Sequence, residues 1–162
     1  MSAQSTQPDS RSDSASAQLR RKAVMAVLSD AAPDTLQEAL AKLGSLPAHD
    51  VIRTPETGLV MVRGRMGGTG SPFNLGEVTV TRCVVRMESG ETGSSYILGR
   101  NKQHSLNAAI ADALWQMPDM TATVESEVVA PLENLRLEER KQVDEETAAT
   151  RVDFFTMVRG DD

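Results

Sequence analysis

Cationic residues placed next to glycines are the residues of this chain best suited to chemistry, and that chemistry is anion binding. In Gly99-Arg-Asn-Lys-Gln-His104, three side chains that can carry positive charge lie at a predicted strand-to-helix junction. Backbone N–H groups at a helix start and cationic side chains together favour a phosphate or carboxylate. Arg100, Lys102 and His104 are therefore possible anion-binding residues. The alternative interpretation is an ordinary surface helix start with a neutral, exposed histidine.

A second glycine-rich segment, Gly64-Arg-Met-Gly-Gly-Thr-Gly-Ser71, has N–H groups that could enclose an anion. It is not a Walker A loop, because no Lys-Ser/Thr pair follows the glycines. It is not a dinucleotide fingerprint either, because Ser, Pro and Phe73 come next. We favour a wide hairpin turn in which glycines supply positive φ. Arg63 and Arg65 remain possible anion-binding residues.

The nucleophilic and metal-ligating residue types form no catalytic constellation in the sequence. Cys83 lies in the middle of a predicted strand, which favours a buried thiol over a nucleophile. His104 and Asp112 lie about 12 Å apart along one helix, too far for a direct pair. His49 is isolated, so the histidines lack metal-ligand spacing, and Trp115 is interpreted as a packing residue. The sequence thus predicts no catalytic residue, no metal site and no cofactor bound by this chain.

The composition restricts the partners and the compartment. The 162 residues carry a formal charge of −6, which argues against nucleic acid or an anionic membrane as the main partner. The single cysteine permits no internal disulfide, and it excludes an iron–sulfur cluster held by this chain alone. An apolar run of 18 residues and a signal-peptide pattern are both missing from the sequence, so we expect a soluble, cytoplasmic protein without a membrane span.

Two short helices are expected near the N-terminus. Residues 1–17 have almost no side chains to bury and are predicted to be disordered. Apolar residues at helical spacing predict a helix from about Gln18 to Leu28. A second helix is expected from Pro33, which suits a first turn, to Gly44, a typical stop. Together they would form a helical hairpin that needs a surface on which to bury its apolar side.

The middle of the chain changes to strand patterns. Four strands are predicted: Val51–Thr54, Leu59–Arg65, Glu77–Met87 and Ser94–Gly99. The turn-like Pro55-Glu-Thr-Gly58 separates the first two, which favours an antiparallel meander. In the third strand the apolar residues change from even to odd positions after Val80. This change predicts a β-bulge or a twist near Thr81–Arg82.

Helices return after the strands. Asn101 is a candidate cap for a helix that runs to Gln116 and packs across the sheet. A last helical region, Val124–Ala149, is marked or kinked at Pro131 and becomes strongly polar, as in a solvated arm. The predicted fold is therefore α+β: an N-terminal helical hairpin, an antiparallel four-stranded sheet with a packed helix, and a C-terminal helical arm. Residues 18–149 would form this domain, and residues 150–162 a docking segment.

The docking segment has an unusual composition for a terminus. Two of the three phenylalanines, Phe154 and Phe155, lie there beside Met157. Chain ends usually fray unless something holds them. The block is therefore expected to dock, either on the protein's own core or on a partner.

Four blocks of the sequence, in their order and spacing, resemble one protein family. They are Thr54-Pro-Glu-Thr-Gly-Leu-Val60, Arg65-Met-Gly-Gly-Thr-Gly70, Gly99-Arg-Asn-Lys-Gln-His104 with Asp112-Ala-Leu114, and Arg151-Val-Asp-Phe-Phe-Thr-Met-Val-Arg-Gly-Asp161. They are similar to the PhnG family, whose members belong to the bacterial phosphonate carbon–phosphorus lyase system. The resemblance runs from about residue 18 to the end. The Ser-rich residues 1–17 are extra, and Asn101 stands where the family often has Asp.

The resemblance implies that this chain is a subunit of a complex and has no activity by itself. In that system PhnG forms a core complex with subunits H, I and J, joined by ATP-binding-cassette proteins, and two copies of this chain per complex are expected. PhnG and subunits H, I and L transfer an alkylphosphonate to the ribose C1 of ATP with loss of adenine, as α-D-ribose 1-methylphosphonate 5-triphosphate synthase in organic phosphonate catabolism. Subunit I carries the nucleosidase-like activity. The iron–sulfur cluster and S-adenosylmethionine belong to subunit J.

For the residues of this chain, the resemblance implies that the C-terminal block docks on subunit I. Phe154, Phe155 and Met157 would be anchors, because buried aromatics dominate interface energies. Three charged residues would set the register: Arg151, Asp153 and Arg159. Two alternatives stay open, a direct contribution to phosphate or nucleotide binding and a free-standing anion-binding domain. Both would use the five cationic residues Arg63, Arg65, Arg100, Lys102 and His104.

Overall fold

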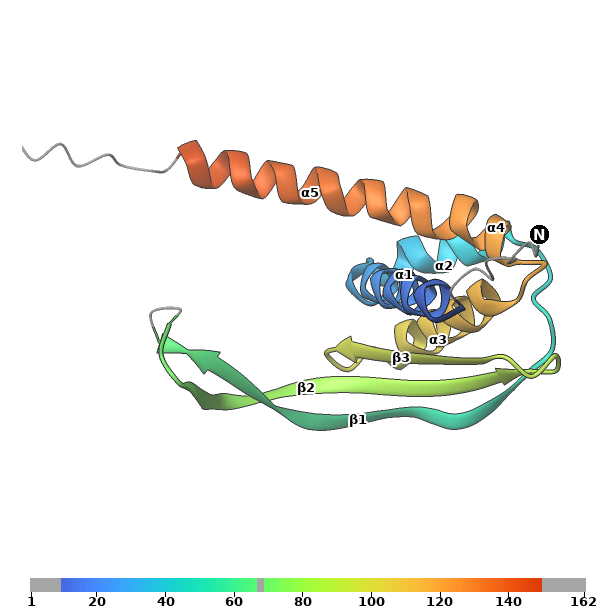
Figure 1. The fold of residues 1–162 in the computed structure, drawn as a ribbon, viewed down its shortest axis with the longest axis horizontal. Coiled ribbons are helices and arrows are strands. Elements are labelled where there is room, and N and C mark those ends of the chain that lie inside the picture. The colour runs from blue at the N-terminus through green and yellow to red at the C-terminus, as the bar shows by residue number, and fades with distance from the viewer. Residues whose placement is uncertain (1–9, 67–68, 150–162) are drawn as a thin grey trace, which may run out of the picture.

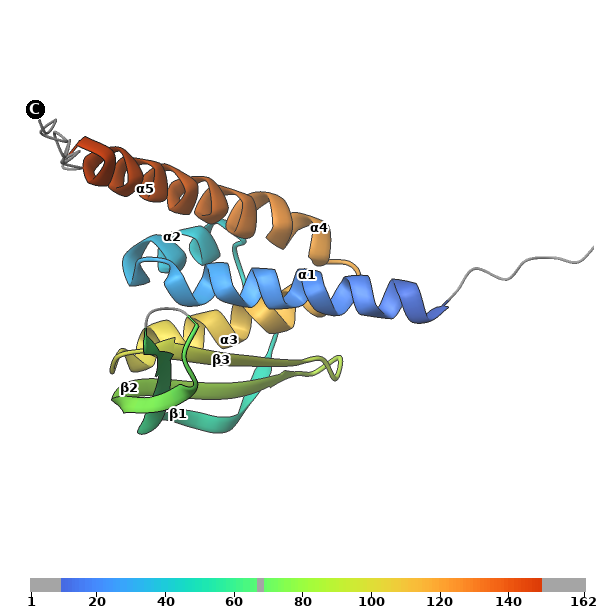
Figure 2. The ribbon, with the colours of Figure 1, turned by 60° about the vertical axis from the view of Figure 1, so that its left-hand side comes forward.

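Helices cover one face of a three-stranded antiparallel sheet (Figures 1 and 2). The computed structural model describes residues 10–66 and 69–149. Its elements are α1 (Ser10–Asp30), α2 (Pro33–Lys42), β1 (His49–Arg65), β2 (Pro72–Met87), β3 (Thr92–Leu98), α3 (Lys102–Gln116), α4 (Thr121–Val124), a π-helical turn (Glu125–Val129) and α5 (Ala130–Ala149). The predicted α+β class is therefore confirmed. Helices α1 and α2 follow each other where a helical hairpin is expected.

Helix α1 begins eight residues before the predicted Gln18. The prediction of disorder is therefore wrong for residues 10–17, and residues 1–9 lie outside the described part. The second half of α1 is anchored, because Val24, Val27 and Leu28 are buried in the core. Once a helix is nucleated by such packing, each further residue adds a hydrogen bond at small cost. The N-terminal turns of α1 thus need no buried face of their own.

The sheet has three strands because the first two predicted strands form one. Strand β1 runs through Pro55-Glu-Thr-Gly58, which is not a turn. The strand order β1-β2-β3 makes β1 an edge strand. Its register shifts between Arg53, which pairs with Val84, and Glu56, which pairs with Arg82. Pro55 lies in this irregularity, and an edge strand with a bulge is where a strand tolerates a proline.

The bulge or twist predicted near Thr81–Arg82 does not lie in β2 itself. The register against β1 shifts beside it, between Arg82 and Val84, and the extra residue is on β1. Strands β2 and β3 pair without interruption from Val80 opposite Leu98 to Arg86 opposite Thr92. The odd residues face the helices, and their buried set is Thr81, Cys83, Val85 and Met87. Val80 is also buried, although alternation places it on the other face. The change from even to odd positions therefore reflects burial on both faces of the strand.

Helix α3 packs across the sheet as predicted and forms the centre of the core. Four of its alanines and Leu114 are almost fully buried. Small side chains let the helix approach the strand beside it very closely. At Gly93 of β3, an added Cβ would lie 2.0 Å from the carbonyl oxygen of Ala109 and 2.5 Å from the backbone nitrogen of Ala113. Gly93 is thus required by this contact.

The C-terminal helical region has an irregular start. The sequence predicts a kink or boundary at Pro131. The π-helical turn ends at Val129, directly before α5 begins at Ala130, so the irregularity lies just before this proline. A proline inside a helix removes a hydrogen bond and clashes with a carbonyl one turn earlier. The carbonyl one turn before Pro131 belongs to Glu127, which lies inside the wider π-helical turn. Beyond it, α5 lies on the side of the helical layer away from the sheet, and its last turns extend past α1 and α2 (Figure 1).

A second projection is formed by strands alone. Strand β3 pairs with β2 only over Val80–Arg86, whereas β1 pairs with β2 as far as Arg65 opposite Pro72. The segment that extends past β3 is therefore a two-stranded ribbon, visible in Figure 1 beyond α1, α2 and α3. We call residues 58–66 and 69–79 the β-arm. Its side chains are not part of the hydrophobic core of the described residues.

Candidate functional site

The junction between β3 and α3 has the geometry of a capped helix start. Gly99 adopts a φ of +94°, which favours glycine, and turns the chain out of β3. Its N–H donates to the Thr79 carbonyl at 2.9 Å, and its carbonyl accepts from the Thr81 hydroxyl at 2.7 Å. The Asn101 side chain accepts from the His104 N–H at 2.9 Å, as the sequence predicts. The cap therefore already occupies one of the N–H groups that an anion would use.

Two of the three cationic residues at this junction are free to bind a ligand. Arg100 and Lys102 are exposed, and neither forms an ion pair with the described residues. His104 differs, because it is only 4% exposed and its Nε2 donates to the Leu28 carbonyl of α1 at 2.9 Å. A buried ring that donates to a carbonyl is poorly placed for the anion binding that the sequence predicts for His104. Its ring instead joins α3 to α1.

The two other predicted arginines lie in a different place. Arg63 and Arg65 are exposed residues of β1 in the β-arm. The junction meets the arm at Thr79, which pairs with Leu59. At about 3.3 Å per strand residue, Arg63 lies about 13 Å and Arg65 about 20 Å further along the arm. The five predicted cationic residues therefore do not form one site.

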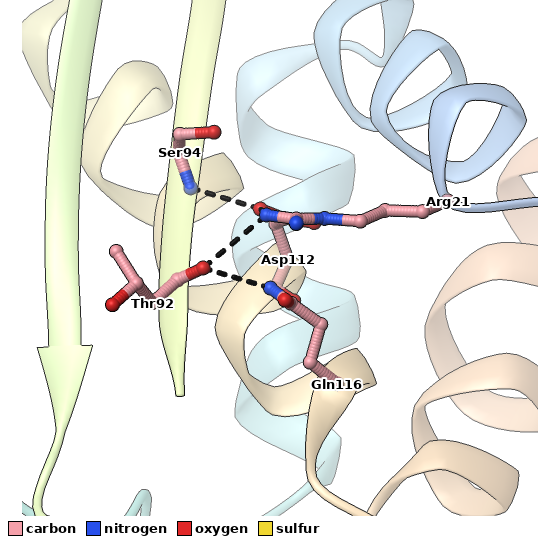
Figure 3. A network of polar contacts seen from close by, with 5 residues as sticks. All are labelled: Arg21, Thr92, Ser94, Asp112 and Gln116. Atoms are coloured by element: carbon pink, nitrogen blue, oxygen red, sulfur yellow. Dashed lines mark hydrogen bonds and ion pairs between the residues drawn. The ribbon is translucent and has the colours of Figure 1, made fainter. Parts of the chain in front are cut away.

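The most extensive polar network of the described domain is centred on Asp112 (Figure 3). This fully buried carboxylate accepts from Arg21 Nε at 3.0 Å, from Arg21 Nη2 at 2.8 Å and from the Ser94 N–H at 2.8 Å. Arg21 and Gln116 also donate to the Thr92 carbonyl, at 3.2 and 2.9 Å. The hydrogen bonds with Asp112 raise the pKa of the Arg21 guanidinium. The network connects α1, β3 and α3. Its polar groups form hydrogen bonds with one another, so the network serves to hold these three elements together.

A second network joins α1 to the π-helical turn. Arg20 donates to Glu133 at 2.8 Å and to Glu125, the first residue of that turn. Glu125 also accepts from the Trp115 indole N–H at 2.5 Å. Trp115 is half-buried against the core, so its interpretation as a packing residue is confirmed. The sequence holds no local signal for the ion pairs of either network, because each arginine lies 91 to 113 residues from its carboxylate partners.

The residue types most often used in catalysis are engaged elsewhere. Cys83 is fully buried, its thiol donates to the Arg53 carbonyl at 3.3 Å, and burial raises the pKa of the thiol. A thiol with a raised pKa is a poor nucleophile. Within residues 10–66 and 69–149, the His, Cys, Asp and Glu side chains form no group of three that could hold a metal ion. No helix of this described part is long and apolar enough to cross a membrane.

Comparison with known proteins identifies the family. The model of the family described as "Phosphonate metabolism protein PhnG" matches residues 19–160. The chain belongs to the PhnG family. A curated relative from Rhizobium meliloti (strain 1021), named alpha-D-ribose 1-methylphosphonate 5-triphosphate synthase subunit PhnG, is 48% identical over 151 residues. The alignment covers 93% of this chain and 96% of the relative.

The PhnG match includes the C-terminal block up to residue 160. The predicted partner-binding residues are therefore part of the family's sequence, although they lie outside the residues that the structure describes. They are Arg151, Asp153, Phe154, Phe155, Met157 and Arg159. The described structure places the end of α5, at Ala149, away from the core (Figures 1 and 2). The block thus follows a helix that projects from the domain.

Proposed function

We propose that this PhnG protein is a subunit of α-D-ribose 1-methylphosphonate 5-triphosphate synthase. Together with subunits H, I and L it would serve the transfer of an alkylphosphonate to the ribose C1 of ATP, with loss of adenine. The observation that carries the proposal is the 48% identity to the synthase subunit over nearly the whole of both chains. Partners I, H and J and the ATP-binding-cassette subunits, in a complex with two copies of this chain, belong to the same proposal.

Within the complex, this chain would contribute to assembly and another subunit would carry out catalysis. The support comes from the groups that catalysis would need. Cys83, His104 and Asp112 are buried, and each is held in contacts between elements of the fold. A buried group that already has its partners cannot approach a substrate without breaking them. We further propose that the C-terminal block docks on subunit I.

Coexpression with subunits H, I and L tests the proposal. The full chain should copurify with subunit I, and the complete set should release adenine from ATP when methylphosphonate is present. Removal of residues 151–162 should leave a folded domain, measured by circular dichroism, that no longer copurifies. A truncated chain that is still captured by subunit I would contradict the docking role. A full chain that no subunit captures would contradict the assignment to the synthase.

A second candidate function, a direct contact with phosphate, is favoured by one observation. Arg100 and Lys102 are exposed and have no ion-pair partner among the described residues, beside the start of α3. The double substitution R100A/K102A distinguishes the two roles, with R86A as a control on exposed charge elsewhere in the sheet. Reduced turnover in an intact complex would support contact with substrate. Unchanged turnover would support a role in assembly alone.

A further inference from the structure

The β-arm projects from the domain with open edges. Strand β1 is an edge strand of the sheet. On the other side, β3 ends at Leu98 and Gly99 turns away, so β2 has no neighbouring described strand from Val78 outward. An isolated two-stranded ribbon is only marginally stable in water. An open edge also offers unpaired N–H and C=O groups to another chain. The arm thus has the geometry of an element that is completed by a partner.

The arm also exposes large apolar side chains. Five of them are at least 43% exposed: Leu59, Met61, Met66, Phe73 and Leu75. Single exposed apolar residues are common on soluble proteins, but clusters mark surfaces that bind another molecule. On β1, Leu59 and Met61 point to the same side, since side chains alternate along a strand. This face gains stability only when an apolar surface covers it.

The charge of the arm is opposite to that of the whole chain. Arg63 and Arg65 continue the same face of β1 beyond Leu59 and Met61. Neither arginine forms an ion pair with a carboxylate of the described residues. Across residues 58–79 the only acidic residue is Glu77, so this segment carries a net charge of +1 in a chain of −6. Glu77 pairs directly with Met61 and therefore lies on the same face. The face thus has two apolar residues with one carboxylate beside them at its base, and two arginines at its tip.

We propose that the β-arm is a docking element for another protein subunit. The complementary surface would be apolar opposite Leu59 and Met61 and would carry carboxylates opposite Arg63 and Arg65. A small anion would neutralise the arginines but leave the apolar side chains in water, whereas a protein surface satisfies both. This interface is separate from the C-terminal block. The inference rests on the proposed function in taking the partner to be another subunit of the synthase.

Matched substitutions in the full chain test the two halves of the face. L59S/M61S removes the apolar part, and R63E/R65E reverses the charge. The controls are L98S, at a side chain 73% exposed on β3, and R86E, at an exposed arginine on β2 outside the arm. Subunits H, I and J are coexpressed with each variant, and the dissociation constant is measured by biolayer interferometry on the subunit that captures the wild-type chain.

Each arm variant should weaken binding at least about tenfold, the effect of losing one substantial interface contact. Both controls should bind as the wild type does, and R63E/R65E should also remove most of the salt dependence. Arm variants with wild-type affinity would overturn the inference and leave the proposed function intact. Wild-type chain that binds no subunit would instead contradict the proposed function. A dimer of the chain alone that the arm variants abolish would assign the face to a second copy and overturn the choice of partner.

A shortened arm guards against variants that fail to fold. Val60 and Val78 are directly paired, so the 17 residues between them can be replaced by Asn-Gly, the typical two-residue hairpin turn. The core does not include the removed side chains, so this variant should keep the thermal midpoint of the wild type within a few degrees. It should also lose binding at least about tenfold. A folded short-arm variant with wild-type affinity would refute the docking role.

Discussion

Replacement of Gly93 by alanine should destabilise the domain severely. The added Cβ would lie 2.0 Å from the Ala109 carbonyl oxygen, 2.5 Å from the Ala113 nitrogen and 2.7 Å from the Ala113 Cβ. Ordinary contacts of such atoms lie about 3.4 Å or more apart, so β3 and α3 must separate by more than about 1 Å. Two of the three atoms belong to the helix backbone, which cannot rotate away as a long side chain can. Overpacking of a core costs about 1–3 kcal/mol, and we expect the upper end of this range or more.

Urea unfolding followed by circular dichroism measures this cost. A loss of about 3 kcal/mol would remove a large part of a typical stability of about 5–15 kcal/mol. It would also lower the thermal midpoint by roughly 6–12 °C in a domain of this size. The control is Gly58 in the same sheet, where an added Cβ has no neighbour within 4 Å. G58A should leave stability unchanged or raise it by up to about 1 kcal/mol. A G93A variant within about 0.5 kcal/mol of the wild type would refute the close β3–α3 contact.

Three further predictions concern buried polar groups. D112A should lower the free energy of unfolding, measured in urea, by about 2–4 kcal/mol, because the Ser94 N–H loses its acceptor, while the partly exposed Arg21 can turn to water. A loss below about 1 kcal/mol would contradict this prediction. H104A should lower the free energy of unfolding by about 1–3 kcal/mol, because the Leu28 carbonyl loses its donor, and turnover in an assembled complex should not change. A variant of full stability with lost turnover would instead support a role of His104 in binding. Cys83 should react with a thiol reagent only on unfolding. Because burial raises its pKa in the folded state, stability should fall as pH rises above about 9; a pH-independent profile that matches a C83A control would contradict this.

Local patterns predict the helices better than the strands. The helix from Asn101 to Gln116 follows from a capping side chain and apolar residues at helical spacing, both of which act within one segment. Pro55-Glu-Thr-Gly58 has the composition of a turn, yet it lies inside β1. A proline breaks a central strand but not an edge strand, and strand order cannot be read from composition. The even-to-odd change in β2 misleads for a related reason, because burial on the second face at Val80 also depends on tertiary packing.

The candidate site shows the same division. The sequence by itself indicated the chemistry of the cationic residues, the cap at Asn101, the buried thiol of Cys83 and the PhnG family, since these depend on residue type and short spacing. Tertiary structure alone decided that Arg63 and Arg65 lie on a projecting arm, far from Arg100. It also paired Asp112 with Arg21 across 91 residues and turned the His104 ring onto α1. Contacts between distant segments depend on how helices and strands pack together, and no local pattern encodes that arrangement.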